Sequence, residues 1–386
     1  MKEQLVNKFK EVFGEQETVI DSGDIQTFFA PGRVNLIGEH TDYNGGHVFP
    51  CALTIGTYAV IKKNPDKLLR FYSMNFQQIG VISSTIENLQ YDKGDDWANY
   101  PKAVIWALEQ KGYKIQQGMD ILYYGNIPNQ SGLSSSASIE VLTGYIVKEL
   151  FHFNFDMVEL AKICQYAENQ FIGVNCGIMD QFAIAMGKKG YAIFLDTTNL
   201  TYEYAPLKLK GMKIVIANTN KKRGLGDSKY NERRKECETA LLDLQSVANI
   251  QSLGELNEEE FEAYKSTIKD PICRKRAKHA VYENQRTIQA VEALKNNDIY
   301  LFGQLMNASH ISLRDDYEVT GYELDTLVEA AWKQKGVFGS RMTGAGFGGC
   351  TVSVVDENLV ERFIDEVGKE YEKKVGYKAD FYVVDV

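Results

Sequence analysis

Apolar residues recur along the chain at two spacings, which together predict a mixture of helices and strands. Spacing of three and four residues is typical of amphipathic helices. It predicts helices over residues 1–14, 97–108, 139–146, 154–172, 299–307, 323–336 and 359–371, and a largely helical stretch with charged faces over 231–293. Runs rich in β-branched and aromatic residues predict strands. These runs lie at 27–30, 69–73, 80–82, 119–124, 191–195, 212–217, 351–355 and 381–386.

Residues 48–62 also carry a strand pattern in two runs, at 48–53 and 56–61. We therefore expect a β-hairpin or a pair of strands in this segment. A chain of 386 residues suits two domains. We expect the boundary in the segment between the strands at 191–195 and 212–217, which gives an N-terminal domain over 1–205 and a C-terminal domain over 206–386.

A loop rich in glycine and serine, Gly125 to Ser138, follows the strand at 119–124 and leads into a helix. Such a loop leaves backbone N–H groups free at the helix N-terminus, where the helix dipole favours an anion. Gly132 lets a phosphate approach the backbone closely, and the serine hydroxyls add hydrogen-bond donors and an oxygen that could bind Mg²⁺. The loop has neither the Walker A signature nor the dinucleotide-binding signature. A plain serine-capped helix start is the alternative interpretation.

Residues 31–46 concentrate ionisable side chains between glycine and proline residues. Arg33, Glu39, His40 and Asp42 lie within ten positions of one another. Carboxylates and an imidazole on a turn suit a polyhydroxylated molecule, because vicinal hydroxyls both donate and accept hydrogen bonds. A polar surface loop would explain any one of these residues, but their density favours a binding site.

Two more carboxylates occupy positions of interest. Glu168 falls on the apolar face of the predicted helix 154–172, and a carboxylate that points inward needs a cation or strong donors. Mg²⁺ shared with phosphate oxygens is one solution, and an arginine or lysine partner is the other, which the residues alone favour. Asp180 falls in the first turn of a short helix, where the helix dipole stabilises a carboxylate, although aspartate is common at helix starts.

Composition narrows the choice of partners. The net charge of −9 argues against nucleic acid as the main partner, and we expect the local clusters of Lys and Arg to be solvated faces or anion contacts. The six cysteines form no Cys-x-x-Cys pair, so we expect no zinc site. The N-terminus has no apolar signal-peptide core, and no apolar run reaches transmembrane length. We therefore expect a cytoplasmic protein with reduced thiols and no membrane contact.

Three stretches resemble, in order, the motifs of the GHMP small-molecule kinases: residues 31–46, 132–137 and 344–349. Within that group, the first stretch resembles the galactokinase motif, Gly-Arg-Val-Asn-Leu-Ile-Gly-Glu-His-Thr-Asp-Tyr-Asn-Gly-Gly. The motif spacing extends the resemblance over essentially the whole chain. It implies an α+β, two-domain GHMP-kinase fold: an N-terminal α/β domain with a left-handed β-α-β unit, a ferredoxin-like C-terminal domain, and an active site between them.

The resemblance also implies an activity, the transfer of the γ-phosphoryl group of ATP to the C1 hydroxyl of α-D-galactose. It implies that Asp180 is the base that accepts the hydroxyl proton, and that Arg33 stabilises this carboxylate and the transition state. The implied sugar contacts are Glu39, His40, Thr41, Asp42 and Tyr230. The implied nucleotide contacts are Ser73, Gln130, Ser131, Gly132, Leu133, Ser134, Ser135 and Ser136. Ser136 and Glu168 match the family's Mg²⁺ positions.

One position departs from the family pattern, since the phosphate loop usually begins with glycine where this chain has Gln130. Two alternatives to a galactokinase-type activity stay open. One is a sugar 1-kinase for N-acetylgalactosamine, galacturonate or arabinose, and the other is a galactose sensor with weak catalysis. The complete serine run 134–136 favours catalysis. We expect small-molecule substrates only, and a monomer or a weak homo-oligomer.

Overall fold

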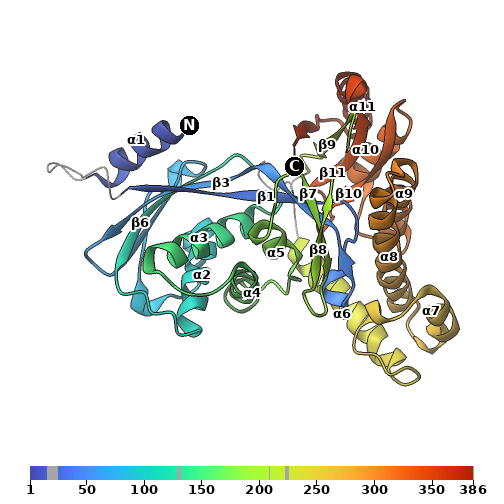
Figure 1. The fold of residues 1–386 in the computed structure, drawn as a ribbon, viewed down its shortest axis with the longest axis horizontal. Helices are drawn as coiled ribbons and strands as arrows, with labels where there is room; N and C mark the ends of the chain where they lie inside the picture. Colours follow the sequence, from blue (N-terminus) through green and yellow to red (C-terminus); the bar gives the residue numbers. More distant parts are fainter. Residues whose placement is uncertain (15–24, 128–131, 208, 222–225, 386) are drawn as a thin grey trace.

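The computed structural model describes residues 1–14, 25–127, 132–207, 209–221 and 226–385, and the structural statements below refer to these. Their strands form two sheets (Figure 1). The larger sheet contains β1 (Gln26–Asn35), β2 (His47–Val48), β3 (Pro50–Asn64), β4 (Leu68–Ser73), β5 (Ile82–Thr85), β6 (Gly118–Gly125), β7 (Tyr191–Asp196) and β8 (Tyr202–Pro206). The smaller sheet contains β9 (Met212–Asn218), β10 (Val337–Thr343), β11 (Cys350–Asp356) and β12 (Asp380–Val384).

Helices cover both faces of the larger sheet, as Figure 1 shows. One face carries α2 (Asn99–Gln110), α3 (Ser135–Phe151), α4 (Met157–Ala167) and α5 (Met179–Ala185), and the other carries α1 (Lys2–Phe13). Neighbouring strand residues alternate between these layers, because side chains of a strand point to opposite faces. Ile61 packs with the helices α2 to α4, whereas Val60 packs against Leu5 and Phe9 of α1.

Strand order sets up a β-α-β unit in this sheet. The order is β2-β7-β3-β6-β4-β5, with β1 also paired to β3 and β8 to β7. β4 and β6 are parallel, and the chain passes between them through β5 and α2. β6 then leads directly toward α3, which places the glycine- and serine-rich loop between a central strand and a helix start.

The smaller sheet is antiparallel, in the order β10-β11-β9-β12. Helices α10 (Tyr322–Trp332) and α11 (Val360–Val375) pack on one face, and α9 (Ile299–Asp315) packs on the other. The remaining helices of this half are α6 (Gly226–Leu244), α7 (Glu258–Tyr264) and α8 (Pro271–Lys295). Ile216 and Val352 of the smaller sheet share one apolar cluster with Val34 of β1 and with Phe49, which lies between β2 and β3. The two sheets therefore meet through a common core.

The prediction of a β-hairpin or a pair of strands over residues 48–62 is wrong, because β3 continues from Pro50 to Asn64 as one strand. Gly56 lies inside it, where β3 pairs with both β1 and β6. A Cβ atom at Gly56 would lie 2.1 Å from the Ala30 carbonyl oxygen, and the register with β1 shifts nearby, between Pro31 and Arg33. The glycine thus permits a close approach of two strands and does not form a turn.

The helix predicted over 154–172 also differs in detail. Asp156 caps α4 by accepting a hydrogen bond from the Glu159 N–H, as its spacing indicated. However, the α-helix ends at Ala167, and residues Glu168–Ile172 form a single π-helical turn. Such turns are rare and occur frequently at functional sites.

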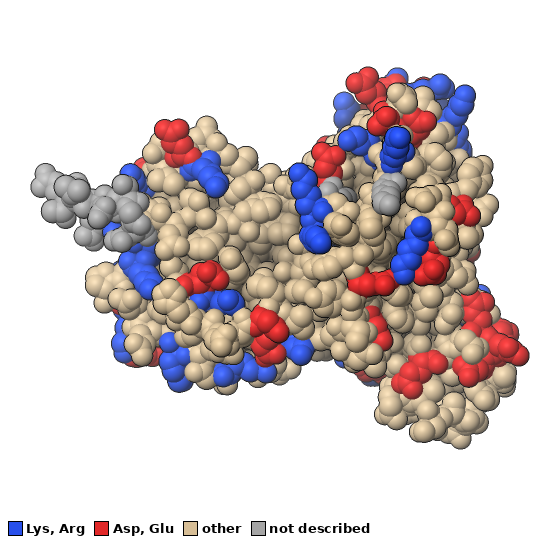
Figure 2. Space-filling view, viewed as in Figure 1, with Lys and Arg blue, Asp and Glu red and all other residues tan. Residues whose placement is uncertain are grey.

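On the face shown in Figure 2, basic side chains are interspersed with acidic ones and form no broad single-sign surface. Three consecutive glutamates, at 258 to 260, open α7. No helix in the described ranges is long and apolar enough to cross a bilayer.

Candidate active site

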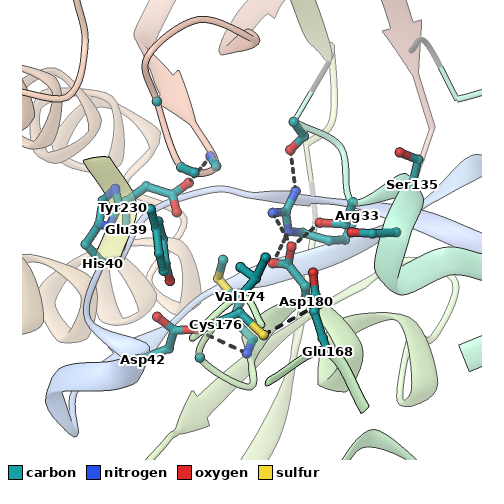
Figure 3. Close-up of a pocket in the computed structure, with 18 of the residues that line it drawn as sticks. Arg33, Glu39, His40, Asp42, Ser135, Glu168, Val174, Cys176, Asp180 and Tyr230 are labelled. Carbon is teal, nitrogen blue, oxygen red and sulfur yellow. Dashed lines mark hydrogen bonds and ion pairs between the residues drawn. The ribbon is translucent and has the colours of Figure 1, made fainter. Parts of the chain in front are cut away.

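A cavity of about 490 Å³ lies where the two halves of the chain meet, and side chains from all three motif stretches line it (Figure 3). The first stretch contributes Arg33, Glu39, His40 and Asp42, the second contributes Gly132, Ser134, Ser135 and Ser136, and the third contributes Gly344, Ala345, Gly346 and Phe347. Glu168, Asp180 and Tyr230 complete the set of lining residues that the sequence predicted.

An ion pair between Arg33 and Asp180 lies near the middle of the site (Figure 3). Arg33 comes from the end of β1, and its Nε and Nη2 donate to the two carboxylate oxygens of Asp180 at 2.8 Å each. Its Nη1 donates to the Gly132 carbonyl at 2.7 Å. The Arg33 side chain is 4% exposed and that of Asp180 is 30% exposed. The guanidinium is therefore fixed, while the carboxylate is accessible from the cavity.

The glycine- and serine-rich loop delivers the N-terminus of α3 to this pair. The loop is close to β1, because the Arg33 N–H donates to the Leu133 carbonyl at 3.3 Å. Ser134 has left-handed backbone angles (φ 59°, ψ 50°), and its hydroxyl donates to Asp180 Oδ2. A non-glycine residue in this region is strained, and such strain is frequently found at functional sites. The exposed helix start is suited to an anion.

The second glycine-rich stretch contacts the first at Gly132. A Cβ atom at Gly344 would lie 2.9 Å from the Gly132 carbonyl oxygen, and Gly344 has φ of 85°. Both the contact and the conformation require glycine. The turn after β10 therefore packs directly against the glycine- and serine-rich loop.

Glu39 is buried at the cavity wall, and its carboxylate is tied to the second glycine-rich stretch. Oε1 accepts hydrogen bonds from the Gly344 N–H at 2.8 Å, from Thr343 Oγ1 at 3.1 Å and from Arg341 Nη1 at 3.4 Å. These contacts fix one carboxylate oxygen and orient the second.

His40 has φ of 61° and is held by a ring of aromatic neighbours. Its Nδ1 lies 2.8 Å from the Tyr43 hydroxyl, and its ring centre lies 5.6 Å from that of Tyr230. Burial, with the nearby charges of His279 and Arg233, lowers the pKa of His40 to about 3. The imidazole is therefore neutral at physiological pH. Its Nε2 is buried and meets no hydrogen-bond geometry among the described residues, although the Ala345 backbone is close enough to act on the His40 pKa, so this nitrogen can serve a ligand hydroxyl.

Asp42 accepts hydrogen bonds from the Tyr43 N–H at 3.1 Å and from the Met179 N–H, at the start of α5, at 3.3 Å. Burial, together with the charge of Asp180, raises the pKa of Asp42 to about 6. Gly177 makes room for it, since a Cβ atom there would lie 1.9 Å from Asp42 Oδ2. A buried carboxylate in this position would be stabilised by ligand hydroxyl groups that donate hydrogen bonds to it.

Glu168 lines the opposite side of the cavity, next to Cys176 in Figure 3. Gln181 Nε2 donates to Glu168 Oε2 at 2.6 Å and to Glu140 Oε2 at 3.1 Å. Burial, together with the charge of Glu168, raises the pKa of Glu140 well above its ordinary value. Gln181 follows Asp180 in α5, so one helix turn connects the Arg33 pair with Glu168.

Some predicted contacts lie away from the cavity wall. Thr41 is buried and donates to the Gly38 carbonyl at 3.0 Å and to the His47 carbonyl at 2.7 Å. Leu133 is fully buried in the shared apolar core, and Ser73 is buried at the end of β4, where it accepts from the Asn75 N–H. Gln130 and Ser131 lie outside the described residues.

The cavity also has lining residues that the sequence did not single out. Val174, Cys176 and Gly177 form part of its wall, and Tyr100 lies in the first turn of α2. Arg234 Nη1 of α6 donates to the Asn175 carbonyl at 2.9 Å, which joins this loop to the C-terminal half. The glycine punctuation of residues 173–177 was the available signal, but it does not show which residues face a cavity.

Three family models match the chain. They are "GHMP kinases N terminal domain" over residues 99–188, "Galactokinase galactose-binding signature" over 7–63 and "GHMP kinases C terminal" over 290–373. The galactose-binding signature covers the motif stretch at residues 31–46, and the N-terminal domain model covers the serine-rich loop.

Known proteins resemble the chain over its length. A galactokinase of Clostridium beijerinckii is 65% identical over 359 residues, which are 93% of this chain and 92% of that protein. A galactokinase of Clostridium acetobutylicum is 61% identical over 382 residues, 99% of this chain and 96% of that protein. The crystal structure of Lactococcus lactis galactokinase complexed with galactose superimposes with a TM-score of 0.96 at 50% identity, covering 100% of this chain and 98% of that one.

Proposed function

The chain belongs to the galactokinases of the GHMP kinase family, and from this premise we propose how its cavity performs the reaction. It is an ATP-dependent kinase with the two-domain GHMP-kinase fold, and it phosphorylates galactose at the C1 hydroxyl to give galactose 1-phosphate and ADP. Phosphoryl transfer of this kind depends mainly on positioning and charge neutralisation.

Asp180 is the base that accepts the C1 hydroxyl proton. The observation that carries this role is the position of the Arg33–Asp180 pair in Figure 3, between Glu39, His40, Asp42 and Tyr230 on one side and Ser135 on the other. A carboxylate at this place can take the proton while the oxygen attacks phosphorus. Arg33 holds the carboxylate with two hydrogen bonds, and its positive charge is close to where transition-state charge develops.

The sugar occupies the side formed by Glu39, Asp42, His40 and Tyr230. The two carboxylates accept hydrogen bonds from sugar hydroxyls, and the neutral His40 Nε2 exchanges one with a further hydroxyl. The Tyr230 ring forms an apolar wall for the sugar. Thr41 acts from beneath the surface, since its hydroxyl fixes the turn that carries its neighbours.

The nucleotide phosphates occupy the N-terminal end of α3, where Gly132 and the serines at 134 to 136 line the cavity. We assign Leu133 a packing role beneath the loop and place Ser73 toward the nucleotide side. The phosphate charge is spread over several oxygens, which suits backbone N–H groups and hydroxyl donors.

Mg²⁺ fits the residues that are present. Ser136 and Glu168 offer a hydroxyl and a carboxylate to the same cavity, and Mg²⁺ prefers a few oxygen ligands together with phosphate oxygens and water. These two residues would hold the ion, and Gln181 fixes the carboxylate of Glu168. When bound, the ion neutralises phosphate charge.

We propose the domain division expected at residues 205 and 206. The change from the larger sheet to the smaller one supports it, because this change lies close by, between the end of β8 at Pro206 and the start of β9 at Met212. The oligomeric state, a monomer or a weak homo-oligomer, stays a prediction from the sequence. The cytoplasmic location stays a prediction from the sequence.

A panel of sugars with coupled ADP detection tests the sugar assignment. We expect galactose to be preferred over N-acetylgalactosamine, galacturonate and arabinose. A higher kcat/KM for one of these three would overturn the choice of sugar while leaving the kinase chemistry intact. A folded protein that binds galactose but releases no ADP would instead favour the sensor alternative.

A further inference from the structure

Behind the sugar side of the cavity lies a cluster of charged side chains that the proposed mechanism does not use. Glu283 and Arg341 are fully buried, and Arg286 lies beside them with its side chain 13% exposed. None of the three belongs to the cavity lining. Burying a charged group costs free energy unless the group is paired, so a functional role would explain why this cluster is present.

Glu283, on α8, holds the backbone of the sugar-binding turn. Its Oε1 accepts hydrogen bonds from the Gly38 N–H at 3.1 Å and the Glu39 N–H at 3.4 Å, and also from the Ser309 hydroxyl. Its Oε2 accepts from Arg286 Nε at 2.8 Å. Gly38 has φ of 95°, and a Cβ atom there would lie 2.7 Å from the His47 carbonyl oxygen. The two N–H groups therefore point at the carboxylate from a turn that requires glycine.

Arg341, on β10, contacts the side chain of Glu39. Its Nη1 donates to Glu39 Oε1 at 3.4 Å and to the Asn35 carbonyl at 3.1 Å, while its Nε donates to Ser309 Oγ at 3.1 Å. Its Nη2 is buried without a hydrogen-bond partner among the described residues and lies 3.9 Å from Glu283 Oε1. Arg341 thus lies between the carboxylates of Glu39 and Glu283 and makes only long contacts with both.

We infer that Glu283 is a positioning residue for galactose recognition: it fixes the backbone of Gly38 and Glu39, and it shares Arg341 with the Glu39 carboxylate. This inference rests on the proposed role of Glu39 as a sugar ligand. Two carboxylates face two guanidinium groups in the cluster, so its charge is balanced. Without the charge of Glu283, Arg341 would be drawn to Glu39 and would compete with the sugar hydroxyls for its oxygens.

The charge state of Glu283 agrees with this role. Burial alone would raise the pKa of Glu283, but Arg286, His279 and Arg341 outweigh it and lower the pKa to about 2. Glu283 is therefore ionised at neutral pH, where it acts only as a hydrogen-bond acceptor. His279, one turn earlier on α8, adds to the same support, because its Nε2 lies 3.1 Å from the Glu39 carbonyl oxygen.

The direct hydrogen bonds of Glu283 and Arg341 to the site lie on the sugar side. These contacts reach Gly38, Glu39 and Asn35, and none of them reaches Gly132 or the serines at 134 to 136. Loss of Glu283 should therefore affect galactose binding and leave nucleotide binding unchanged. A residue that only stabilises the fold would show no such selectivity.

The test is Glu283→Gln in the full chain, with galactose affinity measured by calorimetry and steady-state KM and kcat measured for both substrates. We expect the galactose Kd and KM to rise roughly tenfold or more, since charge-assisted hydrogen bonds are lost. We expect kcat and the KM for ATP to stay within about twofold, because the kcat of the bound complex depends on groups outside the cluster.

Asp120→Asn is the matched control. Asp120 is a mostly buried carboxylate on β6, paired with Arg70 and Asn64 at 2.9 and 2.8 Å and absent from the cavity lining. It should lower the melting temperature without changing the galactose Kd. An unchanged galactose Kd in Glu283→Gln, or equal losses for galactose and ATP, would overturn the inference.

Two further variants keep the outcome decisive. If Glu283→Gln does not fold, Ser309→Ala replaces it, since this change keeps every charge but removes a shared partner of Glu283 and Arg341. It should weaken galactose binding selectively, and an unchanged Kd would count against the inference. Glu39→Gln tests the proposed sugar contact of Glu39 separately from the positioning role of Glu283. If it leaves the galactose Kd unchanged, the sugar role of Glu39 fails, and the inference fails with it.

Discussion

Asp180→Asn changes one atom in a pair whose geometry leaves little freedom. Asp180 Oδ1 accepts from Arg33 Nε, and Oδ2 accepts from both Arg33 Nη2 and the Ser134 hydroxyl. Arginine can only donate hydrogen bonds. The amide nitrogen of asparagine must therefore oppose a donor of Arg33 on one side, whichever way the amide turns.

The structural cost follows from these contacts. One of two charge-assisted hydrogen bonds is lost, each worth about 1.5–3 kcal/mol, and the guanidinium loses its counter-charge. Because the Asp180 side chain is 30% exposed, water replaces part of this loss. We expect the free energy of unfolding to fall by about 2 kcal/mol, the lower part of that range. The variant should therefore fold.

The catalytic cost is larger. Removal of a general base typically lowers the rate by about 10²- to 10⁴-fold. This corresponds to roughly 3–5 kcal/mol in the activation barrier. Galactose binding should survive within a few-fold, because Glu39, His40 and Asp42 keep their own partners.

The assay combines three measurements on Asp180→Asn: kcat by coupled ADP detection, the galactose Kd by calorimetry, and the melting temperature. Ser134→Ala is the comparison at saturating ATP, because Ser134 also lines the nucleotide side; it removes one donor to the carboxylate and keeps the base. Its kcat should fall much less. A folded Asp180→Asn protein with kcat near that of the unchanged enzyme would refute the assignment of Asp180 as the base.

Three further predictions address other parts of the site. Glu168→Gln should raise the Mg²⁺ concentration needed for half-maximal rate several-fold at saturating ATP, and an unchanged Mg²⁺ titration would reduce Glu168 to a structural partner of Gln181. Asp42 has a pKa of about 6 against an ordinary 3.8, so its protonated form is favoured by folding, and its contribution to stability is present below the ordinary value and lost as pH rises through 6. Only the ionised carboxylate of Asp42 accepts hydrogen bonds with both oxygens, so calorimetry should show galactose affinity falling as pH decreases from 7 to about 5. Asp42→Asn should flatten this pH profile. A slope that persists in the variant would exclude Asp42 as its cause. Gly177→Ala should weaken galactose binding, because its Cβ atom would displace the Asp42 carboxylate, which lies 1.9 Å from the position it must take; unchanged affinity would show that Asp42 can move without consequence.

The sequence was most informative where function is encoded by neighbouring residues. Residues 31–46 and the serine-rich loop were each predicted as candidate sites from local composition, the family resemblance joined them in one active site, and the structure places both stretches at one cavity. Asp180 was placed correctly in the first turn of a helix. Caps and glycine positions are local features, which is why sequence patterns predict them.

Long-range contacts were not accessible in this way. Glu283 lies 245 positions from Gly38, and nothing in the surrounding helix pattern distinguishes it from a solvated glutamate. The motif itself does not separate residues that line the cavity, such as Asp42, from Thr41, which packs behind it. A glycine at a close strand contact has the same sequence signal as a glycine in a turn, so the sequence did not show that the runs 48–53 and 56–61 belong to the single strand β3.

The apolar cluster shared by the two sheets bears on how substrates enter and products leave. Swinging one half of the enzyme away from the other would expose side chains such as Val34, Phe49, Ile216 and Val352, each of which is completely buried. Exposing a large apolar side chain costs about 1.5–3 kcal/mol. We therefore expect substrates and products to pass by small movements of partly exposed lining segments such as 173–177, without separation of the two halves. By the same reasoning, heating should melt both halves together in a single calorimetric peak.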